Sequence, residues 1–107
     1  MERVLIVARM KESDIDTVAQ IWGESDATEL PHLVGVQRRS LFHFQGLYFQ
    51  LIEAEQDLNP RIDAVRGNPL WQDVNQKLAD HIKPYDPATW RGPRDAMANR
   101  FYSWQAS

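Results

Sequence analysis

The sequence predicts an α+β fold in which helices cover one face of a four-stranded antiparallel sheet. Three observations lead to this prediction: an unbroken apolar run of strand length near the start, helical periodicity directly after it, and two strand-like runs joined across a two-residue step. A second helical segment and an aromatic run at the end complete the order β-α-β-β-α-β. This order is typical of the ferredoxin-like fold, a split βαβ arrangement.

The first two elements are a buried strand and an amphipathic helix. Residues 4–8 are apolar at every position, as in strands whose two faces are both covered. Ser13 then supplies a capping side chain, and Asp14 places an acid in the first helical turn, where the helix dipole favours negative charge. Apolar residues recur at helical spacing as far as Trp22. We therefore expect a helix from about Asp14 to residues 24–26.

The middle of the chain has the pattern of a β-hairpin. Residues 35–44 and 47–54 are rich in aromatic and branched side chains, and Gln45-Gly46 separates them, with glycine suited to a positive φ in a tight turn. With these two residues as the loop, three cross-strand pairs lie on one face of the sheet. The predicted pairs are Arg39 with Ile52, Leu41 with Gln50, and His43 with Tyr48.

The second helical segment is broken into two helices. Asp57 can cap a short first helix, which Gly67 ends. Asn68-Pro69 then starts a new helix, because a capping side chain is followed by a proline at the first helical position. Apolar residues at helical spacing continue from there to Ile82.

The end of the chain is expected to be irregular up to a last strand. Residues 84–95 hold three prolines and a glycine, which are incompatible with a regular helix or strand. Residues 101–104, Phe-Tyr-Ser-Trp, have the aromatic character of a strand, so we assign the fourth strand to them.

One face of such a sheet has no helices to cover it, yet the sequence makes both faces apolar. Leu5 and Val7 are as apolar as their neighbours in the first strand, and Phe42 and Phe44 flank His43 in the second. An uncovered apolar face of this size is an aggregation liability. We expect a second copy to cover it, most simply as a two-fold homodimer.

Composition excludes several classes of function. The 107 residues suffice for a single domain, 1–107, and fifteen acidic against twelve basic residues give a net charge of −3, which argues against nucleic-acid binding. There is no cysteine, no glycine-rich phosphate-binding motif, and no close spacing among the three histidines that predicts a metal site. No apolar run approaches the roughly 20 residues of a membrane span. These features predict a cytoplasmic protein without membrane contact.

The sequence feature that most suggests chemistry is Arg38-Arg39 within the second strand. Alternation sends the two side chains to opposite faces, so one guanidinium points toward the helices or a partner subunit. An inward arginine needs a carboxylate or an anionic ligand. It can pair with Glu53, Glu55 or an acid of the first helix. Alternatively, Arg39 lines a pocket and stabilises an enolate or phenolate oxygen there; the pocket would also contain Gln50, Tyr48 and His43.

Short blocks of sequence spread over the whole chain resemble the tetracenomycin-type aromatic polyketide cyclase family. They occur in order, without a large insertion between them. The blocks are Thr28-Glu29-Leu30-Pro31, Gly35-Val36-Gln37-Arg38-Arg39-Ser40-Leu41-Phe42, Leu47-Tyr48, Leu51-Ile52-Glu53-Ala54, Asn68-Pro69-Leu70, Asp73-Val74-Asn75, Lys83-Pro84-Tyr85 and Phe101-Tyr102-Ser103-Trp104.

The resemblance implies a small enzyme of bacterial type II polyketide biosynthesis, built as a dimeric α/β barrel. It implies an intramolecular aldol-type ring closure of a poly-β-ketone or partly cyclised intermediate, with loss of water and aromatisation. The pocket would lie between sheet and helices. Neither a metal nor an organic cofactor is expected. Further partners implied by this pathway are the polyketide synthase and an acyl carrier protein.

The resemblance also assigns roles to residues. Arg39 matches the pocket arginine of the family, Asp26 is the expected acid or base, and His43 and Tyr48 are reserves for the same chemistry. Relatives carry a histidine where this chain has Ser25, and another where it has Gln50; neither replacement titrates near neutral pH. We therefore expect these two residues to bind substrate. The expected flat walls of the pocket are Trp22, Trp71 and Trp104.

Three other functions stay open at the level of sequence. The same dimeric fold serves cofactor-free monooxygenases that oxidise anthrones to quinones, and fold alone does not separate them from cyclases. A non-catalytic protein that binds and shapes the polyketide, alone or with the synthase, is a second alternative. A stress-response dimer of the same fold is a third, and the two arginines of the hairpin do not support it.

Overall fold

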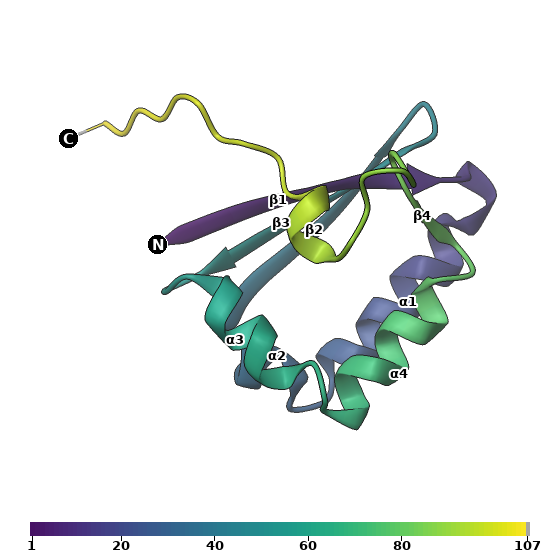
Figure 1. Cartoon of the computed structure of the whole chain (residues 1–107), viewed down its shortest axis with the longest axis horizontal. Helices are drawn as coiled ribbons and strands as arrows, with labels where there is room; N and C mark the ends of the chain where they lie inside the picture. The colour runs from purple at the N-terminus through teal and green to yellow at the C-terminus, as the bar shows by residue number, and fades with distance from the viewer. Residues whose placement is uncertain (107) are drawn as a thin grey trace.

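The computed structural model, which describes residues 1–106, has helices stacked on one side of a four-stranded sheet (Figure 1). The strand order is β2-β3-β1-β4, and neighbouring strands are antiparallel. This is the predicted ferredoxin-like arrangement. The elements are β1 (Glu2–Met10), α1 (Ile15–Asp26), α2 (Leu30–Val34), β2 (Val36–Phe44), β3 (Leu47–Ala54), α3 (Leu58–Val65), α4 (Pro69–Leu78) and β4 (Ile82–Pro84), with single 3₁₀ turns at η1 (Glu12–Asp14) and η2 (Pro93–Ala96).

The predicted hairpin and its register are confirmed. Gln45 and Gly46 have φ values of 48° and 80°, the pair of positive angles that suits a two-residue turn between twisted strands. The pairs Arg39↔Ile52, Leu41↔Gln50 and His43↔Tyr48 all occur, as predicted. The antiparallel pairing of β1 with β3 extends the sheet on the other side.

A bulge near the start of β2 decides where Arg39 points. Val36 pairs with Ala54 and Arg38 with Glu53, so β2 has one residue more than β3 in this interval. A bulge of this kind shifts the alternation by one position. Val36 and Arg39 therefore lie on the same side of the sheet, and both line the space between sheet and helices.

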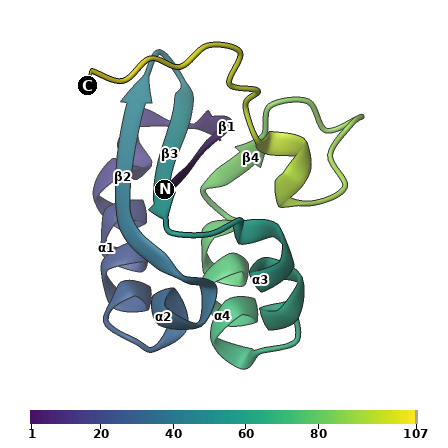
Figure 2. The ribbon, with the colours of Figure 1, turned by 90° about the vertical axis from the view of Figure 1, so that its left-hand side faces the viewer.

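The core lies between the helix-facing side of the sheet and the four helices. Every second residue of β3 is buried, starting at Tyr48, which is the pattern of a strand with one covered face. Helices α1 and α4 pack together, as do α2 and α3, so the helical layer has two halves (Figure 2). The buried apolar residues are Ala8, Met10, Val18, Leu30, Val34, Tyr48, Ile52, Ala54, Leu58, Ile62, Val65, Val74 and Leu78.

The predicted helices all occur, with one correction at the first helix and one helix added. Ser13 was expected to cap the first helix, but it lies within η1, and α1 follows Asp14 without a side-chain capping bond. Asp57 and Asn68 cap α3 and α4 through their side chains, which accept bonds from the backbone N–H groups of Asn59 and Leu70. The sequence reading missed α2, whose five residues are too few to show helical periodicity. It ends at Gly35, which has a φ of 87°, a left-handed conformation typical of a residue following a helix.

The prediction for the last strand is wrong. β4 is Ile82–Pro84, which pairs with residues 8–10 of β1, whereas residues 101–104 are not part of the sheet. Ile82 was expected at the end of the preceding helix, but α4 stops at Leu78. A strand of three residues that ends in proline is too short to show the alternation of apolar and polar side chains by which strands are recognised.

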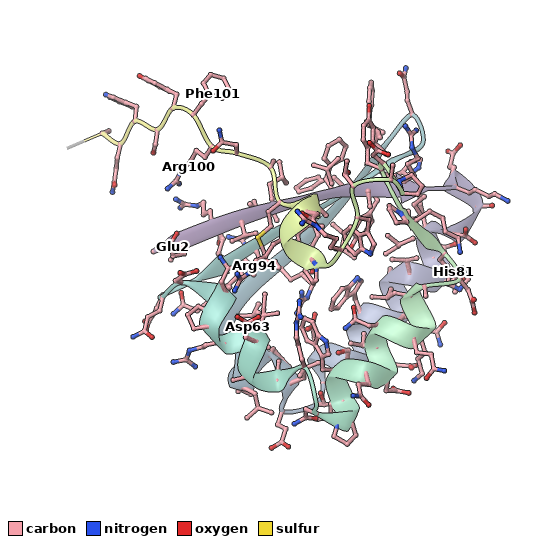
Figure 3. All side chains as sticks on the ribbon, in the orientation of Figure 1. Glu2, Asp63, His81, Arg94, Arg100 and Phe101 are labelled. Atoms are coloured by element: carbon pink, nitrogen blue, oxygen red, sulfur yellow. The ribbon has the colours of Figure 1, made fainter. Side chains whose placement is uncertain are left out.

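The chain after β4 crosses over the helix side of the sheet and then leaves the body of the molecule. Met97 forms an isolated bridge with Ile6, and the N–H of Ala98 donates to the carbonyl of Leu5 at 2.7 Å, so this segment continues along the edge of β1 after β4. Beyond it the tail extends outward, with Phe101 92% exposed (Figures 1 and 3).

The opposite side of the sheet carries exposed aromatic side chains. Phe42 is 55% exposed and Phe44 is 62% exposed, both in β2. They pair across the hairpin with Phe49 and Leu47. No helix within residues 1–106 is long and apolar enough to cross a membrane.

Candidate active site

A cavity of about 920 Å³ lies between the sheet and the helices. Residues of β1, β2 and β3 line one wall, α1 to α4 line the other, and the segment from β4 to η2 contributes residues as well. Its volume is at the upper end of the range for pockets that hold small organic ligands, roughly 300–1,000 Å³. The cavity is the expected pocket between sheet and helices.

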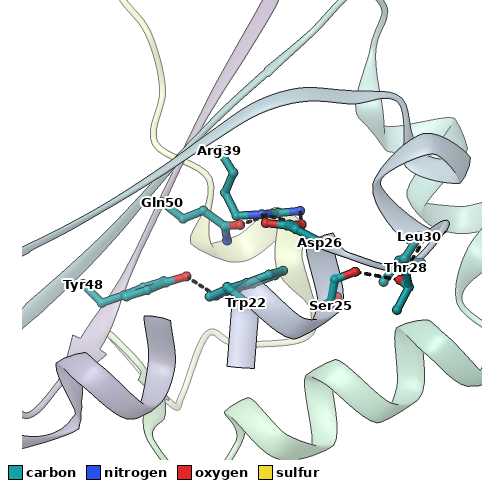
Figure 4. Close-up of polar contacts among 8 residues, drawn as sticks. All are labelled: Trp22, Ser25, Asp26, Thr28, Leu30, Arg39, Tyr48 and Gln50. Carbon is teal, nitrogen blue, oxygen red and sulfur yellow. Dashed lines mark hydrogen bonds and ion pairs between the residues drawn. The ribbon is translucent and has the colours of Figure 1, made fainter. Parts of the chain in front are cut away.

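Arg39 lines the cavity where charged and polar side chains meet. Its Nε lies 3.0 Å from Oδ2 of Asp26 and its Nη2 lies 2.9 Å from Oδ1, a two-pronged ion pair between β2 and the end of α1 (Figure 4). Its Nη1 donates to Oε1 of Gln50 in β3. The Trp22 ring covers one face of the guanidinium, 4.0 Å from ring centre to Cζ. The side chain of Arg39 is only 11% exposed.

These contacts fix the guanidinium without using all of its donors. A guanidinium has five N–H groups. The bonds to Asp26 and Gln50 take one each on Nε, Nη1 and Nη2. Each of the two terminal nitrogens keeps one more N–H, and Arg39 is a lining residue of the cavity. An oxygen of a bound molecule can therefore accept from a donor whose orientation is already set.

Both interpretations of Arg39 from the sequence are correct in part. It pairs with an acid of the first helix, as one reading expected, and that acid is Asp26 rather than Glu53. It also lines a pocket together with Gln50 and Tyr48, as the other reading expected.

Tyr48 forms a second polar contact inside the cavity. The indole Nε1–H of Trp22 donates to the Tyr48 hydroxyl oxygen at 3.1 Å (Figure 4). Burial raises the pKa of Tyr48 to about 12, outweighing the lowering effects of the Trp22 hydrogen bond and the nearby Arg39 charge. The phenol is therefore neutral at ordinary pH. Because its oxygen accepts from Trp22, its own O–H proton can be donated to a group in the cavity.

Aromatic rings line the cavity, though they are not the full set expected. Trp22 and Trp71 are lining residues, as predicted, whereas Trp104 is not: it is 74% exposed in the tail that leaves the body of the molecule. Trp90 lines the cavity instead. The sequence reading treated residues 84–95 only as irregular and gave Trp90 no role.

Three other predicted site residues also lie outside the cavity lining. Ser25 lines a separate pocket of about 220 Å³ between α1 and α4, because residues 22 and 26 of α1 face the sheet while residues 21 and 25 face α4. His43 lies near the hairpin turn, where its Nε2 donates to the carbonyl of Met10 at 2.9 Å. Asp26 is likewise not a lining residue, although it is ion-paired with Arg39, which is one.

The segment that covers the cavity is attached at several points. The guanidinium of Arg9 stacks on the Tyr85 ring at 4.3 Å and donates to the Tyr85 carbonyl. At the other end of the segment, Nη2 of Arg94 lies 2.7 Å from Oδ2 of Asp63 on α3 (Figure 3). The cover is therefore held to β1 on one side and to a helix on the other.

The cavity lining is basic, although the protein as a whole is acidic. Among residues 1–106 it contains four cationic side chains and no carboxylate. The four are Arg39, Arg66, Lys83 and Arg91. Within the same part of the chain, no three His, Asp or Glu side chains are grouped closely enough to hold a metal ion.

A comparison with protein-family models decides which family this chain represents. The model of the polyketide synthesis cyclases matches residues 2–105, nearly the full length. The chain belongs to this family. The resemblance read from the sequence blocks is thereby confirmed.

Individual cyclase-family relatives match over nearly their whole length. The polyketide synthase CurG of Streptomyces cyaneus is 48% identical over 105 residues, covering 98% of each chain. The tetracenomycin F2 cyclase of Streptomyces glaucescens is 43% identical over 104 residues, covering 97% of this chain and 94% of the relative. The solved structure of that cyclase, described as a type II polyketide cyclase, superimposes with a TM-score of 0.93 over the full length of both chains.

A more distant structure has the same fold. It belongs to a protein of Nitrosomonas europaea described as an antibiotic biosynthesis monooxygenase, with 9% identity and a TM-score of 0.54 over 77% of this chain and 86% of that one. At this level of identity the likeness concerns the fold alone.

Proposed function

We propose that this polyketide cyclase closes a ring in a poly-β-ketone, or in a partly cyclised intermediate, by an intramolecular aldol condensation without a cofactor. The observation that carries the proposal is the oriented guanidinium of Arg39, which has two donors left for an oxygen inside an aromatic-lined cavity. Family membership and the resemblance to the tetracenomycin F2 cyclase support the substrate class.

Arg39 stabilises the oxyanion of the reaction. A methylene between two ketones loses a proton, and the resulting enolate carbon attacks a ketone carbon across the forming ring. The attacked carbonyl oxygen takes a proton and becomes a hydroxyl group, which then leaves with a ring hydrogen as water, and the ring becomes aromatic. Donors that are fixed before the negative charge develops stabilise it without reorganising.

Asp26 and Tyr48 are proposed to assist in different ways. The Asp26 carboxylate holds Arg39 in place, and it is the group we propose to accept and return the substrate proton. The Tyr48 hydroxyl, neutral and buried, donates a hydrogen bond to a substrate oxygen. His43 bonds to a backbone carbonyl and lies outside the lining, which disfavours it as a reserve.

The shape of the cavity is proposed to select which carbons meet. Poly-β-ketones react with themselves in solution, so a folded arrangement that brings the correct pair together accounts for much of the benefit. Trp22, Trp71 and Trp90 offer flat apolar surfaces to a developing aromatic ring. Gln50 holds Arg39 and contributes a buried amide to the same wall.

The test is the mass of the product formed from a polyketone released in situ by a type II polyketide synthase, with and without this protein and without oxygen. The proposal predicts faster formation of one ring-closed isomer that has lost one water. A product that gains oxygen only in air would instead indicate a monooxygenase. An unchanged product under both gases, with the polyketone bound, would indicate a binding protein and contradict catalysis.

We further propose that the enzyme acts as a homodimer through the uncovered face of its sheet. Phe42 and Phe44 are more than half exposed there, and the face continues over Phe49 of β3. A second copy related by a two-fold axis would cover the same residues on both chains. The synthase and its acyl carrier protein remain proposed partners of the substrate-delivery step.

A further inference from the structure

The cavity has a second cationic group of residues, separate from Arg39. Arg66 follows α3 and Arg91 lies in the covering segment, and both are lining residues. Figure 2 shows β2 and α1 on one side of the molecule and α3, α4, β4 and η2 on the other. Arg39 thus enters the cavity from one side, and Arg66 and Arg91 from the other.

The Arg66 guanidinium packs against the backbone of the covering segment at Gly92, the residue after Arg91. A Cβ added to Gly92 would lie 3.1 Å from Nη2 of Arg66, so the guanidinium fits against the backbone of the residue that follows Arg91. Any larger side chain at position 92 would displace Arg66. Arg66 and the part of the covering segment that carries Arg91 therefore meet at this side of the cavity, and both arginines line it.

The charges of these two arginines are weakly neutralised. Nε of Arg66 lies 3.8 Å from Asp63, whose other oxygen binds Arg94 at 2.7 Å. Nε of Arg91 lies 3.5 Å from Asp95. Both distances exceed ordinary hydrogen bonds. Arg39, in contrast, has a bidentate carboxylate partner, and Lys83, the fourth lining cation, donates to the backbone carbonyl of Ala79 at 2.7 Å. Arg66 and Arg91 are therefore the lining guanidiniums whose charge is least neutralised.

These two side chains are also placed where a charge can be bound at low cost. The side chain of Arg66 is 53% exposed and that of Arg91 is 88% exposed, against 11% for Arg39. Arg66 and Arg91 therefore lie at the solvent-exposed rim of the cavity. A carboxylate held at the rim keeps part of its hydration, whereas one taken to the buried end would lose it. The apolar body of the same molecule can then extend inward along Trp71 and Trp90.

We propose that Arg66 and Arg91 bind a carboxylate, so that the substrate is a free polyketide acid whose reacting carbons lie near Arg39. This inference rests on the proposed cyclase function and specifies its substrate class and binding polarity. The two arginines orient the substrate: they select which end enters first, and thus which carbonyl oxygen reaches the Arg39 donors. They take no part in the bond changes.

Calorimetric titration with a matched pair of probes tests the proposal. The probes are 4,5-dihydroxyanthraquinone-2-carboxylic acid and its methyl ester, which differ in charge at one end. The wild-type protein is expected to bind the acid at least tenfold more tightly than the ester. In the double variant Arg66→Gln, Arg91→Gln the ratio falls to about one, whereas Arg66→Lys, Arg91→Lys retains part of it. The control Arg61→Gln removes an arginine of α3 outside the lining and keeps the full ratio.

Equal binding of acid and ester by the wild-type protein, or an unchanged ratio in the double glutamine variant, would overturn the proposal. A second arm compares phosphopantetheine with pantetheine. A preference for the phosphate that the double variant loses, together with equal binding of acid and ester, would assign the rim to a carrier-bound substrate and contradict a free acid. Turnover of the polyketone is followed separately, so a missing acid preference with intact cyclisation rejects only this inference.

Discussion

Arg39 and Asp26 form a two-pronged ion pair between the second strand and the end of the first helix, with Nη2 2.9 Å from Oδ1 and Nε 3.0 Å from Oδ2. The pair orients a guanidinium whose remaining donors serve the cavity. Trp22 stacks on it and Gln50 binds a third nitrogen, so its position does not depend on a ligand. Such pre-orientation is what oxyanion stabilisation requires.

Removing the charge of Asp26 is expected to disable this arrangement. Asp26→Asn keeps the shape of the side chain but removes both the ion pair and the proposed proton acceptor, and we expect the cyclisation rate to fall at least tenfold. The matched control is Asp16→Asn, an exposed acid at the start of the same helix. A rate for Asp26→Asn equal to wild type would contradict a role for Asp26.

Combining Asp26→Asn with Arg39→Gln shows whether Asp26 and Arg39 act independently or as one unit. Residues that act as one unit show strongly non-additive effects. We therefore expect Asp26→Asn combined with Arg39→Gln to be no slower than the worse single variant. A double variant clearly slower than both single variants would instead show that Asp26 and Arg39 act independently.

Tyr48 is expected to contribute to stability in a pH-dependent way. Its pKa is about 12 in the folded protein because of burial, and about 10 when unfolded, so at pH values between these the unfolded chain releases a proton that the folded one keeps. The contribution of neutral Tyr48 to the free energy of unfolding is therefore fully present below pH 10. The free energy of unfolding falls by about 2 to 3 kcal/mol as the pH rises from 10 to 12.

Urea unfolding of the wild type and Tyr48→Phe between pH 8 and pH 12 measures this contribution. The variant loses the part of the alkaline slope due to Tyr48. It also removes the acceptor of the partly buried Trp22 N–H, which costs about 1 kcal/mol at neutral pH. Parallel alkaline slopes for the two proteins would show that Tyr48 ionises as freely in the folded state as in the unfolded one.

The sheet face provides a prediction about assembly. Light scattering on the wild-type protein is expected to give twice the 12.4 kDa chain mass. Phe42→Glu combined with Phe44→Glu places two charges on the uncovered face and is expected to give the single-chain mass with an unchanged circular dichroism spectrum. Leu33→Glu, a comparable change on the helical side, should leave the dimer intact. A wild-type monomer would reject the dimer.

Much of the fold follows from local patterns in the sequence. Asp57 and Asn68 act through bonds to backbone groups two residues away, and Gln45-Gly46 sets the hairpin register through its own φ angles. Such signals do not depend on the rest of the chain. The fourth strand does depend on it, because Ile82–Pro84 is a strand only through its pairing with β1.

The candidate site was predictable where it follows from strand alternation and register. Arg39, Tyr48 and Gln50 come together because the hairpin pairs as predicted. Arg66, Trp90 and Arg91 could not be found in this way, since a segment without regular structure carries them across the cavity and no periodicity records its path. Ser25 and Trp104 were misplaced for related reasons: one faces α4, and the other lies on a tail that the sheet does not hold.

Stabilisation of the oxyanion by Arg39 is tested by the rate at which Arg39→Gln converts a polyketone without oxygen, compared with wild type and with Arg61→Gln as the control. Circular dichroism establishes that each variant is folded. We expect wild type and Arg61→Gln to release one water and form one ring-closed isomer at equal rates, and Arg39→Gln to be at least tenfold slower. An Arg39→Gln variant as fast as wild type would contradict a role for Arg39 in stabilising the oxyanion.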